Sequence, residues 1–392
     1  MQNMKSLQNR GRRGLVALVV ALAFTALASR LAAAGPSPQQ TQPQTQLQRD
    51  ADGIRALGVI GVQAEVRDRA GSRIVTSGRA DRLTGAPVPV QGRFRIASVR
   101  KAMVAVVALQ LVGEGRLGLD DPVGTWLPDT VPGEEGRRIT VRHLLQNTSG
   151  LHDDQPGYET PQGYLEQRYD VHTRDELIAR ALRHRPDFAP GTGWAYSNTG
   201  FLVLGAVVEK AGKRPLERLT RERIAQPLGL KTLSWPGISP LLPAPHARAH
   251  QVFGNGAVVD VTEQVPSDPD AVVGSTRDLT IFFQAVLDGR LLPRPQHEAM
   301  QRTVPVTPEI DAFMPGARYG LGLISRPLAC GGVYWGHDGG DAGFITVTGV
   351  TPDGRRSAVV SMNTALGGTP TDPVRQQRAA DTLIAHALCG RT

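Results

Sequence analysis

The sequence predicts an α/β fold of the α+β type, in which a mixed, mainly antiparallel sheet is built from both ends of the chain. A mostly helical lobe is inserted between the two ends. Strand-like segments separated by turn residues occur near residue 70 and again after residue 330. Segments with helical spacing fill most of the region between them. The roughly 340 residues that follow an N-terminal segment are enough for a large core and two lobes.

Residues 1–34 have the composition of a signal peptide. Four basic residues lie within residues 5–13, an apolar stretch of 14 residues covers 15–28, and Ala32, Ala33 and Ala34 provide small residues for cleavage. A membrane-spanning helix needs about 20 apolar residues. We therefore expect export to the cell-wall space, a secreted product and no stable membrane span after cleavage. An uncleaved anchor is the alternative.

Much of the positive charge belongs to this segment. The formal net charge is +8, and residues 1–34 contribute five basic residues and no acidic ones, which leaves +3 for the rest. The remaining basic residues form no cluster with interleaved aromatic residues. The sequence therefore gives no support for nucleic-acid binding.

The next segment, residues 35–50, is rich in Gln, Pro and Thr and is expected to be a disordered linker. Residues 51–392 are then expected to form one domain. We expect its sheet lobe to comprise residues 51–120 and 290–392, and its helical lobe residues 121–289.

The elements of the domain can be predicted in order. Residues 62–81 read as two strands around a turn at 70–72. A helix follows Ser98 and ends near Gly113 and Gly115. Helical spacing recurs at 173–184, 198–212 and 275–289. Strands are expected at 333–340, 343–350 and 355–364, and a closing helix at 372–388.

Cys330 and Cys389 are the only cysteines. An even number of cysteines in an exported protein predicts a disulfide bond. Two free buried thiols are the alternative.

The first candidate motif is Ser98-Val99-Arg100-Lys101, at the start of a long apolar run. The chain uses Arg at nearly every basic position and has only five lysines, at 5, 101, 210, 213 and 231. Arg cannot release its proton in a protein, whereas a buried Lys can. The motif therefore indicates proton transfer between Lys101 and Ser98. The alternative is that Ser98 only caps a helix and Lys101 is solvated.

Two later motifs carry polar groups at the edge of predicted elements. Tyr196-Ser197-Asn198 precedes an apolar helix, and His337-Asp338-Gly339 ends a strand where glycine permits close approach of a ligand. Taken singly, Asn198 could be a helix cap, Tyr196 a packing residue and His337 a structural histidine.

In this order, the three motifs resemble those of the penicillin-recognising serine hydrolases, which include the class C β-lactamases and the D-alanyl-D-alanine carboxypeptidases. Ser98 to Lys101 matches the family's Ser-x-x-Lys, Tyr196 to Asn198 its Tyr-x-Asn, and His337 to Gly339 its His-x-Gly. The resemblance covers residues 55–390 and is nearest to the secreted actinomycete DD-carboxypeptidases. It implies a β-lactamase/transpeptidase-like fold.

The resemblance also implies roles for the motif residues. Ser98 is expected to be the nucleophile, and either Lys101 or Tyr196 the general base. Asn198, His337 and Gly339 are expected to bind the substrate and stabilise charge. The backbone N–H groups of Ser98 and Gly340 are expected to form the oxyanion hole. No metal and no cofactor are required.

The chain departs from the family where a substrate carboxylate would bind. Ile324 stands at the family's Arg position, with Arg326 two residues on, and Asp338 and Gly340 replace hydroxyl residues. The chain has Asn147 where the family usually has His. An acid in the cleft would repel a carboxylate, although Arg326 could supply a displaced cation.

These observations predict an exported serine hydrolase that works through an acyl-enzyme, with D-alanyl-D-alanine carboxypeptidase activity as the leading expectation. An esterase, amidase or D-aminopeptidase on the same machinery is the alternative, as is a penicillin-binding module with slow deacylation. The expected partner is a small peptide, ester or β-lactam, for example a peptidoglycan stem peptide. The sequence leaves open the general base, the oligomeric state and the roles of Asp338 and Arg326.

Overall fold

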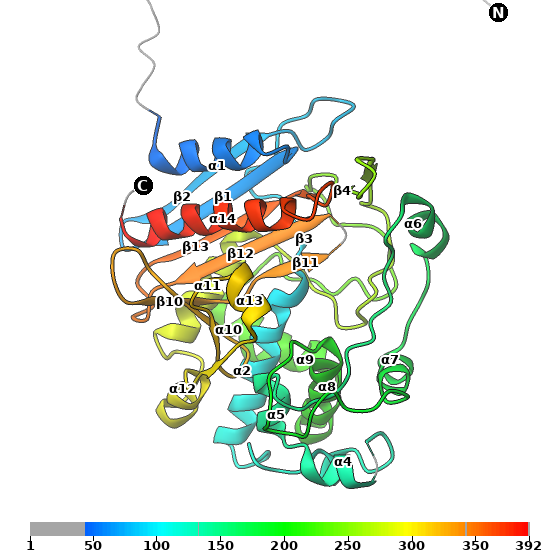
Figure 1. Ribbon diagram of the computed structural model, residues 1–392. Helices are drawn as coiled ribbons and strands as arrows, with labels where there is room; N and C mark the ends of the chain where they lie inside the picture. The colour runs from blue at the N-terminus through cyan, green and yellow to red at the C-terminus, as the bar shows by residue number, and fades with distance from the viewer. Residues whose placement is uncertain (1–43, 132, 342, 391–392) are drawn as a thin grey trace, which may run out of the picture. The chain divides into compact units, whose positions relative to one another are not determined.

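A nine-stranded antiparallel sheet lies at the centre of the computed structural model, which describes residues 44–131, 133–341 and 343–390. Its strands are β1 (Gly61–Asp68), β2 (Gly71–Gly78), β7 (Val304–Pro305), β8 (Arg318–Tyr319), β9 (Ile324–Pro327), β10 (Val333–Gly336), β11 (Gly339–Asp341), β12 (Phe344–Val350) and β13 (Ser357–Met362). The order is β2-β1-β13-β12-β10-β9-β8-β7, and β11 pairs with β12 beside this path. Both ends of the chain therefore build the sheet, as the sequence predicted (Figure 1).

The central strands are buried because helices cover both faces of the sheet. Every residue of β13 is buried, which matches its apolar run Ala358-Val359-Val360. Helices α1 (Gln46–Ala56) and α14 (Asp372–Leu388) lie on one face, and α11 (Thr276–Leu287) packs on the other (Figure 1). The sequence analysis placed the segment of α11 in the helical lobe, yet this helix contacts β1, β12 and β13.

The linker expected at residues 35–50 ends too late, because residues 46–50 belong to α1. Thr45 caps this helix by accepting a hydrogen bond from the Gln48 N–H, and Leu47, Ala51 and Ile54 are buried against the sheet and α14. The segment was predicted as a linker because it is rich in Gln, although its few apolar residues recur with helical spacing. The rest of the linker before residue 44 and the expected signal peptide lie outside the described residues.

Two long helices form the core on the other side of the sheet. In α2 (Arg100–Gly113), eleven of the 14 residues are buried, as expected for a helix that is apolar all round. It packs against α8 (Asn198–Gly212), whose first turn is capped by the Ser197 hydroxyl, the acceptor of a 3.0 Å hydrogen bond from the Gly200 N–H. The sequence predicted both helices at these positions.

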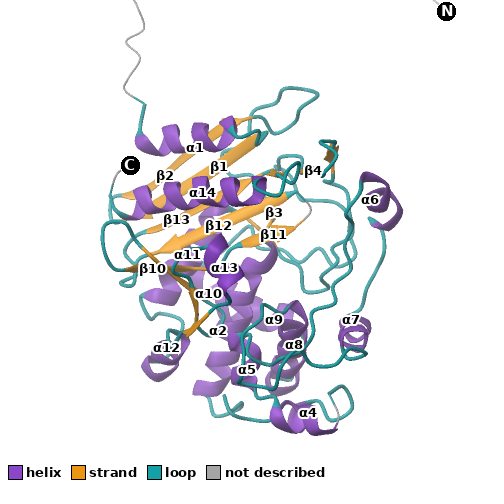
Figure 2. Cartoon of the chain, viewed as in Figure 1, coloured by secondary structure: helices purple, strands orange, loops and turns teal. Residues whose placement is uncertain are grey.

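Shorter elements surround these helices (Figure 2). The helical ones are η1 (Ala97–Val99), α3 (Val123–Trp126), α4 (Gly133–Arg138), α5 (Val141–Gln146), α6 (Pro161–Gln167), α7 (Arg174–Ala181), α9 (Leu216–Thr220), η2 (Arg221–Ala225), α10 (Gln226–Leu228), α12 (Arg294–Met300) and α13 (Pro308–Phe313). The remaining strands are β3 (Phe94–Arg95), which pairs with β6 (Val273–Gly274), and β4 (His250–Val252), which lies between β5 (Val258–Asp260) and β14 (Thr364–Ala365).

A disulfide bond joins Cys330 to Cys389 in the structure. Cys330 lies in the turn between β9 and β10, and Cys389 follows the last residue of α14. The bond therefore links the C-terminal helix to the hairpin that leads into the His337 motif. None of the helices in the described residues is both long and apolar enough to cross a membrane.

Candidate active site

Ser98 lies in a tight turn between β3 and α2. The turn starts at Ala97, whose φ of 50° is left-handed and costs about 1 kcal/mol for a residue with a side chain. Gly339 of β11 packs against this turn so closely that a Cβ atom there would collide with the Ile96 carbonyl oxygen. The turn therefore fixes Ser98 at the N-terminal end of α2, directly beside strand β11.

Lys101 follows one helical turn later and is almost fully buried. Its Nζ donates hydrogen bonds to Ser98 Oγ at 2.9 Å and to Asn198 Oδ1 at 2.7 Å. Burial, and after it the positive charge of Arg100, lower the pKa of Lys101 to about 7. A substantial fraction of Lys101 is therefore neutral at physiological pH, which makes its amine a competent proton acceptor.

Tyr196 completes the contacts around the serine. Its ring centroid lies 4.7 Å from Lys101 Nζ, and its hydroxyl shares a hydrogen bond with Ser98. Burial raises the pKa of Tyr196 well above its usual value, even though this hydrogen bond opposes the shift. The hydroxyl therefore keeps its proton at neutral pH.

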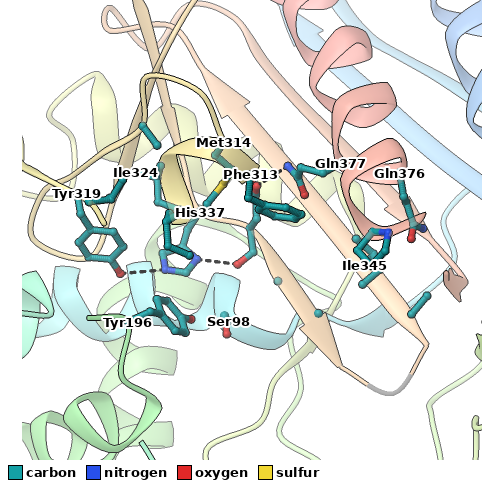
Figure 3. Close-up of a pocket in the computed structure, with 18 of the residues that line it drawn as sticks. Ser98, Tyr196, Phe313, Met314, Tyr319, Ile324, His337, Ile345, Gln376 and Gln377 are labelled. Carbon is teal, nitrogen blue, oxygen red and sulfur yellow. Dashed lines mark hydrogen bonds between the residues drawn. The ribbon is translucent and has the colours of Figure 1, made fainter. Parts of the chain in front are cut away.

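His337 faces the cavity as a neutral ring (Figure 3). Its Nδ1 donates to the Asp338 carbonyl oxygen at 2.7 Å, so its Nε2 accepts from the Tyr319 hydroxyl at 3.0 Å. Burial, followed by repulsion from Lys101, lowers the pKa of His337 to about 3. If Tyr196 were the general base, it would act as a phenolate and would need positive charge nearby, and a neutral His337 provides none.

Two residues that the sequence analysis did not assign hold these groups in place. Asp153 accepts from Asn198 Nδ2 at 2.9 Å and from the Thr199 N–H at 2.9 Å. Its carboxylate therefore turns the Asn198 amide so that the amide oxygen faces Lys101. The only sequence signal for Asp153 is an acid in the loop after α5, which has no characteristic spacing from the three motifs.

Asn147 holds the backbone on both sides of Tyr196. Its side-chain oxygen accepts from the Ser197 N–H at 3.2 Å, and its backbone carbonyl accepts from the Ala195 N–H at 3.1 Å. The backbone of Asn147 has the left-handed conformation, with a φ of 58°. Asn tolerates this conformation better than most residues. The departure from the family pattern at this position is therefore compatible with an ordered Tyr196.

A cavity of about 560 Å³ opens beside Ser98. Most of its lining is apolar, and Figure 3 shows Phe313, Met314 and Ile324 facing it together with Tyr196 and His337. The lining residues are Ser98, Trp194, Tyr196, Asn198, Val306, Ile310, Phe313, Met314, Ala317, Tyr319, Ile324, His337, Asp338, Gly339, Gly340, Ile345, Ala365, Leu366, Pro373, Gln376 and Gln377. Of these described residues, Asp338 alone carries a formal charge.

The Asp338 carboxylate is neutralised by Arg326. Both of its oxygens accept from Arg326 Nη2 at 2.9 Å, and Oδ2 also accepts from Gln377 Nε2 at 2.9 Å. Arg326 is 3% exposed, donates from Nη1 to Asp381 at 2.7 Å, and is not among the cavity-lining residues. The suggestion that Arg326 supplies a displaced cation to the cleft is therefore wrong, because two carboxylates hold its guanidinium elsewhere.

Gly340 lies on the free edge of β11. This strand pairs with β12 alone among the described strands, and Gly340 also lines the cavity next to Ser98. Alternate N–H groups of an edge strand point away from its partner and remain free to bind a ligand. The structure thus brings all the sequence-predicted site residues, Ser98, Lys101, Tyr196, Asn198, His337, Gly339 and Gly340, to one end of the cavity.

Comparison with known proteins identifies the class to which this fold and site belong. Residues 45–383 match the family model described as Beta-lactamase. The chain therefore belongs to the β-lactamase family and is a serine hydrolase of the kind that also includes penicillin-binding proteins. The resemblance predicted from the three motifs is confirmed at the level of the family and its fold.

Three relatives illustrate the range of this family. A D-stereospecific amidohydrolase from Streptomyces sp. has a solved structure that matches with a TM-score of 0.75 and 37% identity, over 84% of this chain and 97% of that one. Esterase EstB of Burkholderia gladioli is 36% identical over 48% of each chain, so the match spans about half its length. The AmpH carboxypeptidase/endopeptidase of Escherichia coli is 28% identical over 65% of this chain and 64% of its own.

Proposed function

We propose that this enzyme hydrolyses esters and amides whose leaving group carries no carboxylate, through an acyl-enzyme on Ser98. The observation that carries the proposal is the lining of the cavity beside Ser98, which is mostly apolar and whose one formally charged residue among the described residues is an acid. The names of the Streptomyces amidohydrolase and of esterase EstB support hydrolysis of amides and of esters.

Neutral Lys101 is the proposed general base. It takes the proton of the Ser98 hydroxyl while Ser98 Oγ forms a bond to the substrate carbonyl carbon. The N–H groups of Ser98 and Gly340 stabilise the resulting oxyanion, and losing one such donor typically costs about 10²–10³ in rate. The proton then passes from Lys101 through the Tyr196 hydroxyl to the leaving group as the carbonyl–leaving-group bond breaks. Water hydrolyses the Ser98 ester by the same steps in reverse.

The leaving group occupies the apolar cavity in this mechanism. The residue that donates the proton must lie beside the departing atom, and both Tyr196 and His337 line that cavity. Asn198 orients Lys101, and neutral His337 and Gly339 shape the wall against which the substrate lies. Burying a carboxylate there would require an opposite charge, and none of the described lining residues is a cation.

A second candidate is the D-alanyl-D-alanine carboxypeptidase activity that the sequence predicted. The similarity to AmpH, whose name states that activity, favours it. Its substrate ends in a carboxylate, for which the cavity offers no cation among its described lining residues, because Arg326 is paired with Asp338 and Asp381. Each 1.4 kcal/mol of unfavourable interaction lowers kcat/KM tenfold. We therefore place this activity behind hydrolysis of uncharged leaving groups.

We also propose that the protein is exported and that its disulfide bond forms in an oxidising compartment. The proposal is supported by the composition of residues 1–34 and by the joined positions of Cys330 and Cys389, whose Cα atoms are 6.0 Å apart. The nearest resemblance within the family, to the actinomycete enzymes, remains a prediction.

A matched substrate panel tests the proposed function. The purified protein and its Ser98→Ala variant are offered p-nitrophenyl acetate, an alanine anilide, diacetyl-Lys-D-Ala-D-Ala and a chromogenic cephalosporin. We expect turnover of the ester and the anilide, weak release of D-Ala, and an acyl adduct on wild type only. Efficient release of D-Ala with little esterase activity would instead establish the carboxypeptidase. A stoichiometric burst without turnover would establish a penicillin-binding module.

A further inference from the structure

The charges of the ion-pair network beside the apolar cavity do not cancel. Arg326 donates hydrogen bonds to Asp338 and also to Asp381, which lies on α14. A guanidinium carries one positive charge and keeps it, whereas two ionised carboxylates carry two negative charges. Burial raises the pKa of Asp381 to about 6, so this carboxylate is still ionised in most molecules at pH 8. The Arg326 network, which comprises Arg326, Asp338 and Asp381, therefore carries one surplus negative charge.

The Arg326 network adjoins the wall of the cavity. Asp338 and Gln377 both line the cavity, and Gln377 Nε2 donates to Asp338 Oδ2 at 2.9 Å and to Asp381 Oδ1 at 3.0 Å (Figure 3). Arg326, the cation of the network, is buried and is not among the lining residues. The cavity therefore lies next to surplus negative charge in a mostly apolar environment, where a charge acts more strongly than it does in water.

Aromatic side chains line the same cavity. The lining includes Trp194, Tyr196, Phe313 and Tyr319, and the ring centroids of Trp194 and Tyr319 are 5.6 Å apart. The face of an aromatic ring carries partial negative charge and attracts cations. The rings and the Arg326 network therefore both favour a cation in this cavity over a neutral group of the same size.

The hydrogen bonds of Asp338 indicate which kind of cation fits. Its carboxylate oxygens already accept from Arg326, from Gln377 and from the Thr348 N–H at 3.3 Å. These bonds occupy most of the acceptor positions of a carboxylate, and an apolar lining cannot accept from the N–H groups of a primary ammonium. A quaternary ammonium has no N–H groups, so it needs only the nearby negative charge and contact with aromatic and apolar side chains.

We infer that the apolar cavity binds a quaternary ammonium group, so that this enzyme hydrolyses esters whose leaving alcohol or phenol carries one. The inference rests on the proposed function, because that function places the acyl group on Ser98 and the leaving group in this cavity. Ser98 Oγ forms its bond to the acyl carbon, the bond to the leaving oxygen breaks, and the serine proton ends on that oxygen. The ammonium keeps its charge throughout, and Lys101 does not repel it in the neutral form that acts as the base.

The test compares two esters of similar shape at pH 8, 4-(trimethylammonio)phenyl acetate and 4-tert-butylphenyl acetate. Because the two phenols differ in acidity, each kcat/KM is divided by the rate constant for hydrolysis of the same ester by hydroxide. After this correction, wild type should favour the cationic ester by at least about tenfold.

Two variants locate the source of this preference. Asp381→Asn removes the surplus charge without changing a lining residue, so it should lower the preference by at least about threefold and leave the tert-butyl ester within about twofold of wild type. Asp353→Asn, in an exposed turn, removes one negative charge elsewhere and is the matched control, which should change neither value.

The outcomes separate this inference from the proposed function. Equal corrected values for the two esters in wild type overturn the inference, and this result does not depend on whether a variant folds. Hydrolysis of p-nitrophenyl acetate but of neither test ester overturns it too, since the three esters differ only in the para substituent. A preference that persists in Asp381→Asn overturns the role of the Arg326 network. Failure of wild type to hydrolyse any of the three esters or the alanine anilide would instead refute the proposed function.

Discussion

At the scale of single residues, the proposed chemistry depends on which group holds one proton. Lys101 is held between Ser98 and Asn198, is buried, and has its pKa lowered to about 7. Tyr196, next to it, has its pKa raised by the same burial. Burial disfavours the charged form of both groups, so it produces a neutral amine and a neutral phenol together. This pairing favours Lys101 as the base over a Tyr196 phenolate.

The pH dependence of acylation should report the titration of Lys101. Its neutral fraction increases as the pH rises through about 7. We expect kcat/KM for a neutral ester to rise about tenfold per pH unit below 7 and to level off above it. Lys101→Arg keeps its proton throughout, so it should lose at least about 10²-fold and show no such rise. A flat wild-type profile from pH 5.5 to 8.5 would contradict this assignment.

Asp153 should influence this titration through Asn198. Its negative charge raises the pKa of Lys101 against the larger effect of burial. Asp153→Asn should therefore lower kcat and also shift the acid limb of the pH profile to lower pH. Asp154→Asn is the matched control, since Asp154 is the next residue but binds Arg180 and His184 instead. A lower kcat with no shift of the acid limb of the pH profile would show that Asp153 has a structural role only.

At the scale of elements, the sequence predicted the position of the helices whose buried residues recur with regular helical spacing. The helices at 198–212 and 372–388 were placed with their observed bounds, because apolar spacing and capping residues agree there. α1 was missed because its three buried residues are spread among Gln and Arg, and composition outweighed periodicity. Asp153, Gln377 and Asp381 could not be found, since they reach the site through folding from distant positions in the chain.

The packing of α1 should contribute measurably to stability. Ile54 is completely buried between α14 and the sheet. Ile54→Ala should lower the free energy of unfolding by about 2–5 kcal/mol, as for other large-to-small changes in a core. Arg49→Ala, on the exposed side of the same helix, serves as the control and should change little. Equal urea midpoints for the two variants would show that this segment is not docked.

At the scale of the whole molecule, α14 contacts α1 and the sheet and also lines the apolar cavity of the active site. It packs beside α1 on the sheet, and its last turn is linked through Cys389 to the β9–β10 hairpin. The same hairpin carries Arg326 and leads directly to His337. The disulfide therefore restrains the helix and the hairpin that together position the wall of the apolar cavity.

Removing this restraint should destabilise the protein more than it changes the chemistry. Closing a loop between residues 59 positions apart stabilises a fold by roughly 4 kcal/mol on the chain-entropy model. Cys389→Ala should lower the free energy of unfolding by up to this amount, while acylation of Ser98 below the melting temperature persists. Mass spectrometry of the native protein should find neither thiol free to react. Two alkylated cysteines without reductant would contradict the pairing.

The position of the Asp338 carboxylate depends on hydrogen bonds from α14 as well as on the strands beside it. Gln377 and Asp381, both on that helix, complete the hydrogen bonds of Asp338 and Arg326. The selectivity that we propose for the cavity thus depends on residues about 40 positions after the last of the three motifs, in a segment with no role in the proposed bond breaking. A classification based on the three motifs alone will therefore group enzymes that share the reaction chemistry but differ in substrate. Laboratory evolution toward a new leaving group should accordingly sample the C-terminal helix, and not only the residues around the serine.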